Sequence, residues 1–316
     1  GDYVANSLLL VAGVGVGTLL LGVSAAWLTA LCEFPGRKLL SWALLLPMAM
    51  PAYIIAYTYT GLLDLTGPLQ SGLRQVFGWY YGDYYFPEIR SLGGAICMLS
   101  LVLYPYVYLL ARVAFAGQSE AILEASRNLG KGPWQSFFSV SLPMARPSIA
   151  AGLSLALMET LADYGTVAYF GVSTFTTGIF RTWYGLDELT TAAQLCALLL
   201  LFVFALILLE RESRRRLRFH QSASRGIPKL LILRGSRATM ASMFGTAIVV
   251  LGFVLPALQL VYWSVSRWQQ NFNRDFAELL ANSFILAASA AIVRSCAAAL
   301  ALGVGIAILT SHLDVD

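Results

Sequence analysis

Residues 124–143, EASRNLGKGPWQSFFSVSLP, form a polar interval between segments that are otherwise almost continuously apolar. Their pattern predicts two short helices with a break between them. Good helix formers, with apolar residues at helical spacing, predict the first helix over residues 118–129. Gly130 should end it, and Pro133 suits the first turn of a second helix, where its missing N–H is no loss. The prolines at 143 and 147 are expected to end that second helix.

The second predicted helix carries an aromatic face made of Trp134, Phe137 and Phe138. A short helix set apart by glycine and proline breaks can lodge in the cleft of a partner protein as a rigid lever. A plainer interpretation is an ordinary helical hairpin that joins two membrane spans. The spacing alone leaves both interpretations open.

The composition excludes an ordinary soluble domain. Hydrophobic residues make up 58% of the chain and charged residues 12%, whereas soluble domains carry about 25% charged residues. The chain is therefore predicted to be an all-α polytopic membrane protein. Its four cysteines are far apart in apolar surroundings and its two histidines are isolated, so neither a disulfide framework, a metal site nor a cofactor is expected.

Seven segments are long and apolar enough to cross a membrane, which takes about 20 residues of helix. They are residues 6–31, 39–63, 92–116, 148–170, 189–209, 240–265 and 281–310. Pro47 and Pro51 should kink the second span, with neighbouring helices satisfying the carbonyls that the kink frees. Gly13 and Gly17 form a GxxxG pattern, which predicts close helix packing rather than a phosphate loop.

The basic residues predict the orientation of these spans. If the loops alternate between the two sides, fifteen lysines and arginines fall on one side and five on the other. The positive-inside rule places the richer side, including residues 124–143, in the cytoplasm and the N-terminal residue in the periplasm. The basic run RESRRRLRFH, residues 211–220, is interpreted as a topological anchor that meets anionic membrane lipid, and no nucleic-acid partner is expected.

The polar interval resembles the cytoplasmic loop of the membrane-spanning permease subunits of binding-protein-dependent ATP-binding-cassette (ABC) importers. That loop reads Glu-Ala-Ala, three residues, Gly, nine residues, Ile, one residue, Leu-Pro. The matching positions here are Glu124, Ala125, Gly130, Leu142 and Pro143. Ser126 and Val140 depart mildly from the pattern. The resemblance implies that residues 118–147 form a coupling loop, whose helix seats in a groove of a separate ATPase subunit.

A weak internal repeat predicts the domain organisation. Ala-Asn-Ser opens the first span at residues 5–7 and the last span at residues 281–283. We therefore predict a five-span remainder of a first permease repeat over residues 1–212, a basic cytoplasmic linker over 213–239, and the first two spans of a second repeat over 240–316. On this interpretation the chain is a fragment of a longer protein.

Glu159, Asp163 and Arg294 are charged residues well inside predicted spans. Glu159 and Asp163 are four residues apart and should share one helix face near the middle of the fourth span, and Arg294 lies within the seventh. A charge at that depth costs at least about 2.5 to 3.5 kcal/mol unless it faces the bundle interior or a wet cavity. The three residues are thus candidates for a translocation path, with a weak and transient role for the carboxylates. Alternatively, a carboxylate pairs with Arg294 or caps a helix break near Gly165.

A more specific resemblance is densest in ETLADYGTVAYFGVSTFTTGIFRTWYG, residues 159–185. This stretch is similar to the fused two-repeat permeases of ferric-iron importers. The resemblance implies a type I importer permease in the bacterial inner membrane, which accepts Fe³⁺ from a periplasmic binding protein while a separate ATPase subunit hydrolyses ATP. The chain has no Walker A sequence and is not expected to be an enzyme itself. Thiamine, polyamine, phosphonate and sulfate permeases share the coupling loop and stay as alternatives, as does a secondary transporter.

Overall fold

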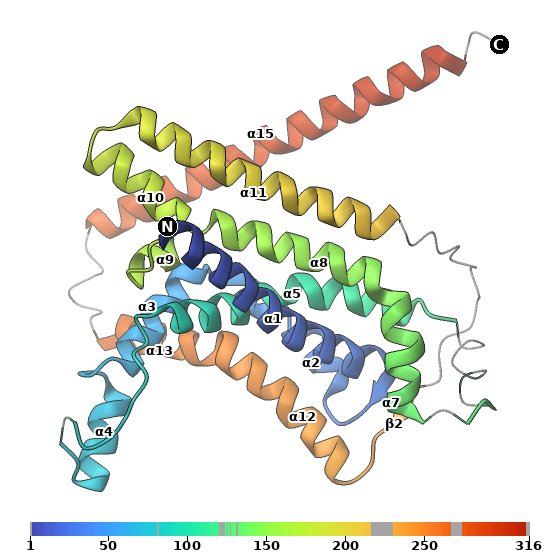
Figure 1. The fold of residues 1–316 in the computed structure, drawn as a ribbon, viewed down its shortest axis with the longest axis horizontal. Helices are drawn as coiled ribbons and strands as arrows, with labels where there is room; N and C mark the ends of the chain where they lie inside the picture. Colours follow the sequence, from blue (N-terminus) through green and yellow to red (C-terminus); the bar gives the residue numbers. More distant parts are fainter. Residues whose placement is uncertain are drawn as a thin grey trace. The chain divides into compact units, whose positions relative to one another are not determined.

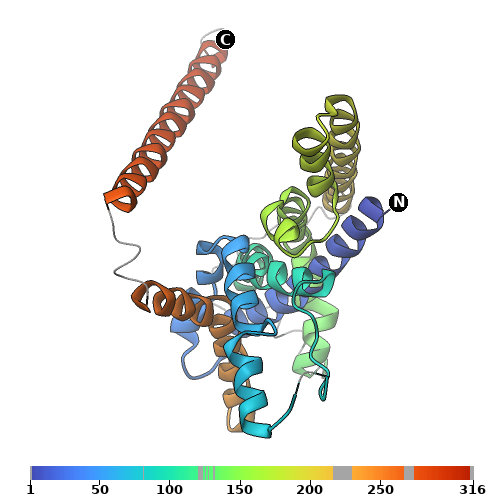
Figure 2. The same ribbon diagram turned by 90° about the vertical axis from the view of Figure 1, so that its left-hand side faces the viewer.

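The computed structural model describes residues 2–80, 82–119, 124, 126, 128–130, 132–215, 230–266 and 274–313. The chain divides into two compact units, Gly1–Gln259 and Leu260–Asp316. Among the described residues, six helices are long and apolar enough to cross a membrane, and a bent helix pair makes a seventh candidate. The all-α polytopic fold, shown in Figures 1 and 2, is therefore confirmed.

Three long helices form the centre of the first unit: α1 (Asp2–Leu31), α5 (Leu92–Ala116) and α8 (Leu142–Ala162). Each is apolar on nearly every side, as expected of a span that packs against both protein and lipid. α5 is the most buried, since it lies between the other two.

Glycines allow these helices to approach closely. A Cβ atom at Gly13 or Gly17 would clash with Ile96 or Ser100 of α5, so the predicted GxxxG pattern is a packing seam. On the other side of α5, a Cβ at Gly152 would lie only 2.7 Å from the carbonyl oxygen of Tyr106. Both neighbours of α5 thus use small residues to reach it.

The second span is broken, as its prolines predict. It consists of α2 (Arg37–Ala43), a 3₁₀ turn (Leu46–Ala49) and α3 (Ala52–Leu63), and the chain bends by 91° at the break. Two tyrosines of α5 donate hydrogen bonds to backbone carbonyls of this broken span, just before the bend. The hydroxyl of Tyr104 donates to the carbonyl of Leu44 at 2.6 Å, and that of Tyr108 to the carbonyl of Ser41 at 2.9 Å. The predicted compensation by a neighbouring helix is confirmed.

The connections of the first unit gather at its two ends. Its N terminus, α4 (Pro68–Phe77), α9 (Gly165–Tyr169) and α10 (Phe175–Phe180) lie at one end, and α11 (Leu189–Arg215) runs from there to the other (Figure 1). The opposite end holds α7 (Pro133–Ser136) and a two-stranded parallel sheet. Among the described connections of the first unit, the loops that the charge pattern assigns to opposite sides are therefore separated in space.

The small sheet joins the α1–α2 connection to a segment 200 residues later. β1 (Cys32–Glu33) pairs with β2 (Leu231–Ile232), and Ser242 of α12 (Ser236–Val249) donates to the carbonyl of Pro35 at 2.7 Å. Burial raises the pKa of the Cys32 thiol to about 12. Residues 216–229 of the predicted linker lie outside the described residues.

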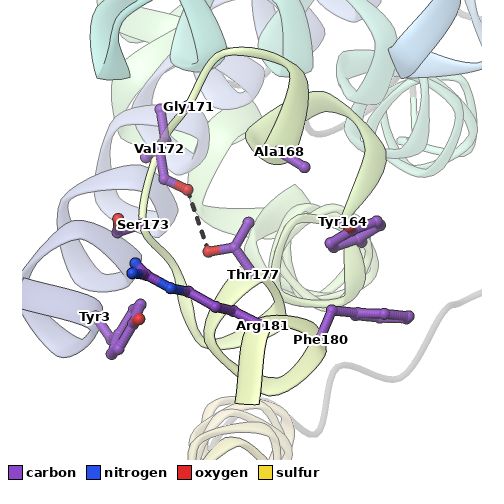
Figure 3. A pocket seen from close by; sticks show the side chains of 9 residues that line it. All are labelled: Tyr3, Tyr164, Ala168, Gly171, Val172, Ser173, Thr177, Phe180 and Arg181. Atoms are coloured by element: carbon purple, nitrogen blue, oxygen red, sulfur yellow. Dashed lines mark hydrogen bonds between the residues drawn. The ribbon is translucent and has the colours of Figure 1, made fainter. Parts of the chain in front are cut away.

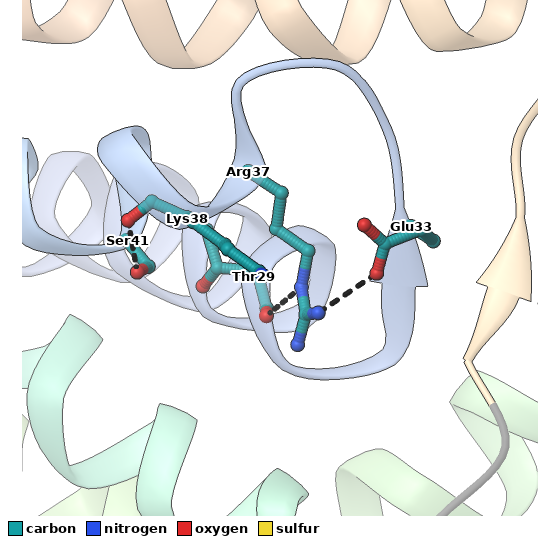
Figure 4. Close-up of polar contacts among 5 residues, drawn as sticks. All are labelled: Thr29, Glu33, Arg37, Lys38 and Ser41. Carbon is teal, nitrogen blue, oxygen red and sulfur yellow. Dashed lines mark hydrogen bonds and ion pairs between the residues drawn. The ribbon is translucent and has the colours of Figure 1, made fainter.

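A polar cluster shapes the turn that leads from β1 into α2 (Figure 4). The Arg37 guanidinium donates to the carbonyl of Thr29 at 2.9 Å and pairs with the Glu33 carboxylate at 2.8 Å. The Thr29 carbonyl is one of the groups that the end of α1 leaves without a helical partner. Ser41 donates to the carbonyl of Lys38 at 2.8 Å in the next turn. Arg37, predicted to be a cytoplasmic charge, therefore also holds the chain reversal.

The last predicted spans have different bounds from those expected. A π-helical turn (Val250–Val254) links α12 to α13 (Leu255–Ser266), and α15 (Arg274–Leu313) begins seven residues before the predicted seventh span. Ile248 and Val249 of α12 are buried in the core of the first unit. Our assignment of residues 240–316 to a second repeat stays a prediction.

Candidate functional site

The predicted coupling loop lies at the end of the first unit that carries α7 and the small sheet. Of its first helix the structure describes Glu124, Ser126 and Asn128, which are helical, while Ala125 lies outside the described residues. Gly130 has φ of 78°, a left-handed conformation that glycine adopts without strain. The predicted helix break at Gly130 is confirmed.

The second half of the loop corrects a prediction. Pro143 and Pro147 do not end the helix that begins at Pro133, because α7 continues through a π-helical turn (Phe137–Ser141) directly into α8. Pro143 falls in the first turn of α8. The N–H of Leu142 donates to the carbonyl of Phe137 across the wide π-helical turn. The wide turn thus accommodates Pro143, which has no N–H to donate to the preceding turn. Pro147 lies inside α8 without ending the helix.

Hydrogen bonds tie the two arms of the loop together. The hydroxyls of Ser126 and Ser136 are 2.7 Å apart and both side chains are buried. The Gln118 amide donates to the carbonyl of Ser141 at 2.8 Å, which anchors the start of the loop to its end. These two hydrogen bonds therefore link Gln118 and Ser126 to the residues that lead into α8.

Five aromatic side chains connect this unit to the membrane helices. We call them the inner aromatic cluster: Trp27, Phe115, Trp134, Phe137 and Phe138. Trp27 of α1 stacks on Trp134 with 5.1 Å between ring centroids and lies 5.3 Å from Phe137. Phe137 also lies 6.0 Å from Phe115 of α5. α7 and the π-helical turn that follows it therefore pack on α1 and α5 through these rings.

Three large apolar side chains in the described part of the loop are exposed, and two of them belong to the inner aromatic cluster. The exposed fractions are 79% for Leu129, 62% for Trp134 and 61% for Phe138, while Phe137 is buried. Exposed large apolar side chains mark a surface that a partner can cover. Trp134 and Phe138 belong to the helical stretch Trp134–Ala162, which is itself long and apolar enough to be a candidate membrane span. Leu142, by contrast, is half-buried and packs on the core.

The predicted translocation residues occupy different structures from those expected. α8 ends at Ala162, and Asp163 is its C-cap with an extended backbone, so Asp163 lies at the end of the helix and not within a longer span. The Asp163 carboxylate accepts hydrogen bonds from the N–H groups of Thr166 and Val167 at 3.0 and 3.2 Å and from the Thr166 hydroxyl at 3.1 Å. The alternative, that Asp163 caps a helix break near Gly165, is confirmed.

Glu159 stays a candidate, although it lies nearer the end of its helix than expected. Its side chain is exposed and lies in the last turn of α8, three residues before the end of a helix that was expected to run to Phe170. Arg294 is exposed on α15, in the second unit. The role of these two residues in a translocation path stays a prediction.

The sequence matches the family described as "Binding-protein-dependent transport system inner membrane component" over residues 18–218. It is 25% identical to an Fe(3+)-transport system permease protein of Haemophilus influenzae over 297 residues, which are 92% of this chain and 54% of that protein. It is 29% identical to a molybdenum transport system permease protein of Escherichia coli K12 over 149 residues, 47% of this chain and 62% of that protein. The chain thus spans about half the length of the iron permease.

Similar folds occur in a solved bacterial ABC transporter that imports the acidic polysaccharide alginate. The TM-score is 0.56 at 16% identity, covering 69% of this chain and 79% of the other. In the same transporter bound to a periplasmic protein that carries an alginate pentasaccharide, the TM-score is 0.54 at 18% identity, covering 67% and 77%. At these identities the likeness establishes the fold, that of an ABC importer permease.

Proposed function

Because the chain belongs to the family of inner-membrane components of binding-protein-dependent transport systems, we propose that it is the permease part of an ATP-driven importer of ferric iron. It is a multi-pass protein of the bacterial inner membrane. In our proposal it receives its substrate from a periplasmic binding protein and releases it into the cytoplasm. ATP hydrolysis takes place in a separate ATPase subunit.

The observation that supports the coupling part of this proposal is the packing of α7 and the following π-helical turn on α1 and α5. The loop exposes Trp134 and Phe138 to a partner, while Phe137 and Trp27 bury its inner side against the membrane helices. A rigid element with one face for a partner and the other on the bundle can pass a displacement from one to the other. Glu124, Gly130, Leu142 and Pro143 act in this element, together with Ala125.

Iron is proposed as the substrate because the iron permease aligns with 92% of the chain and the molybdenum permease with 47%. Molybdenum is the second candidate, because the shorter alignment has the higher identity, 29% against 25%. Uptake of radiolabelled ferric iron and of molybdate, measured with and without the binding protein in cells that carry the intact gene, separates the two.

Substitution of Gly130 by proline tests the coupling role. Proline fixes φ near about −65°, whereas Gly130 has φ of 78°, so Gly130→Pro should distort the loop and abolish substrate uptake. Glu124→Lys should have the same effect by reversing a charge on the loop. Both variants should still insert into the membrane, which immunoblotting of membrane fractions checks.

Gly132→Ala is the matched control, since an added Cβ meets nothing within 4 Å and Gly132 has no positive φ. It should import at the wild-type rate. Normal uptake by Gly130→Pro would refute the coupling role of the loop.

A further inference from the structure

A cavity of 290 Å³ lies beside the start of α1, at the end of the first unit opposite α7. Tyr3 of α1 forms one side, and every other lining residue belongs to residues 164–181 (Figure 3). This part of the chain includes α9, α10 and the loop between them, and none of the residues proposed for coupling lies in it. The cavity is small, near the lower end of the range of about 300 to 1,000 Å³ that ligand pockets occupy.

The cavity wall is built by hydrogen bonds that link the α9–α10 loop to α1. The Asn6 amide donates to the carbonyl of Ser173 at 3.0 Å, and the N–H of Phe175 donates to the Ser7 hydroxyl at 3.2 Å. Thr174 and Thr177 form a reciprocal cap at the start of α10. The loop is thereby held in one conformation, so the cavity is preformed.

Arg181 is the charged residue among those that line the cavity, and its side chain is exposed. The Arg181 side chain extends along the cavity, with its guanidinium group toward Ser173 and near the Tyr3 ring (Figure 3). Within the described part of the chain this guanidinium has no hydrogen-bond or ion-pair partner, and no carboxylate lines the cavity. Tyr164 and Phe180, whose rings stack at 4.1 Å, form an aromatic wall.

We propose that this cavity binds a small anion, an oxyanion or a carboxylate, with Arg181 as its charged contact. A guanidinium presents parallel N–H donors that match two oxygens of such a group, and the hydroxyls of Tyr3 and Ser173 can add donors. A bare trivalent cation would be repelled by the same charge. The inference rests on the proposed import function and narrows its substrate: the arriving species is an oxyanion or ferric iron accompanied by an anionic ligand.

Anion binding to the purified full-length transporter, assembled with its ATPase subunit in lipid nanodiscs without ATP, tests this site. Isothermal titration with molybdate, sulfate, phosphate and citrate, the last with and without ferric iron, should show binding of at least one. Arg181→Gln should weaken that binding about tenfold or more, since hydrogen bonds to charged groups are the strong ones. Arg181→Lys, which keeps the charge but loses the paired donors, should weaken it less.

Arg74→Gln is the control, because it removes an equal charge from the same end of the first unit. Arg74 donates to the Leu65 carbonyl and the Tyr84 hydroxyl and does not line the cavity. Size-exclusion profiles and ATPase rates verify that each variant is assembled. The proposal is overturned if wild type binds none of these anions, or if Arg181→Gln binds as wild type or Arg74→Gln is equally impaired. If no anion binds but ATP-driven uptake is intact, the anion site is refuted and the import function is not. If Gly130→Pro imports normally, the coupling role is refuted and the anion site is not.

Discussion

Asp163 ends one helix and caps the next. It ends α8 with an extended backbone and accepts two N–H groups from the first turn of α9, which have no partner within that helix. Its carbonyl also accepts the Thr176 hydroxyl at 2.7 Å, so the residue joins α8, α9 and α10. The carboxylate therefore has a structural role before any role in transport is considered.

Two substitutions at Asp163 separate these roles. Asp163→Ala removes the cap and should lower the free energy of unfolding by about 0.5 to 2 kcal/mol. Asp163→Asn keeps an acceptor oxygen and should leave stability nearly unchanged. If the charge also contributes to transport, Asp163→Asn will lower iron uptake at unchanged melting temperature.

Glu159→Gln provides the comparison, because Glu159 is exposed and its charge can be removed without breaking a cap. Uptake should fall without loss of expression or of ATPase assembly. Wild-type uptake in the double variant Glu159→Gln, Asp163→Asn would leave both carboxylates with a structural role only.

At the scale of elements, α5 determines how the bundle packs. Gly22 of α1 and Gly152 of α8 approach it from different sides, and a Cβ at either would meet α5 atoms within 3.0 Å. At Gly152 those atoms are the Tyr106 carbonyl and the Val107 Cα, which are backbone and cannot move aside as a flexible side chain could. Position 152 should therefore not accommodate an added Cβ atom without a shift of α5 or α8.

Gly152→Ala should therefore destabilise the protein by about 1 to 3 kcal/mol, the usual cost of overpacking. The control is Gly72→Ala in α4, where an added Cβ meets nothing within 4 Å. Alanine is the better helix former, so this variant should be neutral or more stable by about 0.5 to 1 kcal/mol. Thermal unfolding of both purified variants compares them, and equal melting temperatures would contradict the packing argument.

At the scale of the whole first unit, the coupling loop and the anion cavity occupy opposite ends of the same central helices. α1 touches both, since Tyr3 lines the cavity and Trp27 stacks on α7. An importer needs a site for arriving substrate on one side and a contact for its ATPase on the other. The predicted topology assigns the cavity to the periplasmic end and the loop to the cytoplasmic end.

Labelling of single introduced cysteines with a membrane-impermeant maleimide tests this topology. Cysteines at Trp79 and Trp183 should react from the periplasmic side. Those at Lys131 and Arg216, which lie outside the described residues, should react only after the membrane is opened. A positive-inside arrangement predicts this result, and labelling of Lys131 and Arg216 from opposite sides would overturn it.

The sequence by itself determined the features that depend on neighbouring residues. Runs of apolar residues predict the spans, Pro47 and Pro51 predict the broken second span, and Gly130 predicts the break in the coupling loop. These signals act within a few residues and do not depend on the rest of the fold. The GxxxG pattern predicts close packing in the same way, although it does not identify α5 as the partner.

Only the tertiary structure decided the features that need a partner far along the chain. The stacking of Trp27 on Trp134, the pairing of β1 with β2 and the approach of Tyr3 to the cavity around Arg181 each join segments whose approach no local pattern encodes. It also showed that α8 runs through Pro143 and Pro147 yet stops at Asp163. Prolines are tolerated where a wide turn precedes them, and a carboxylate ends a helix where it caps the next one. Both outcomes depend on how the surrounding helices satisfy the backbone.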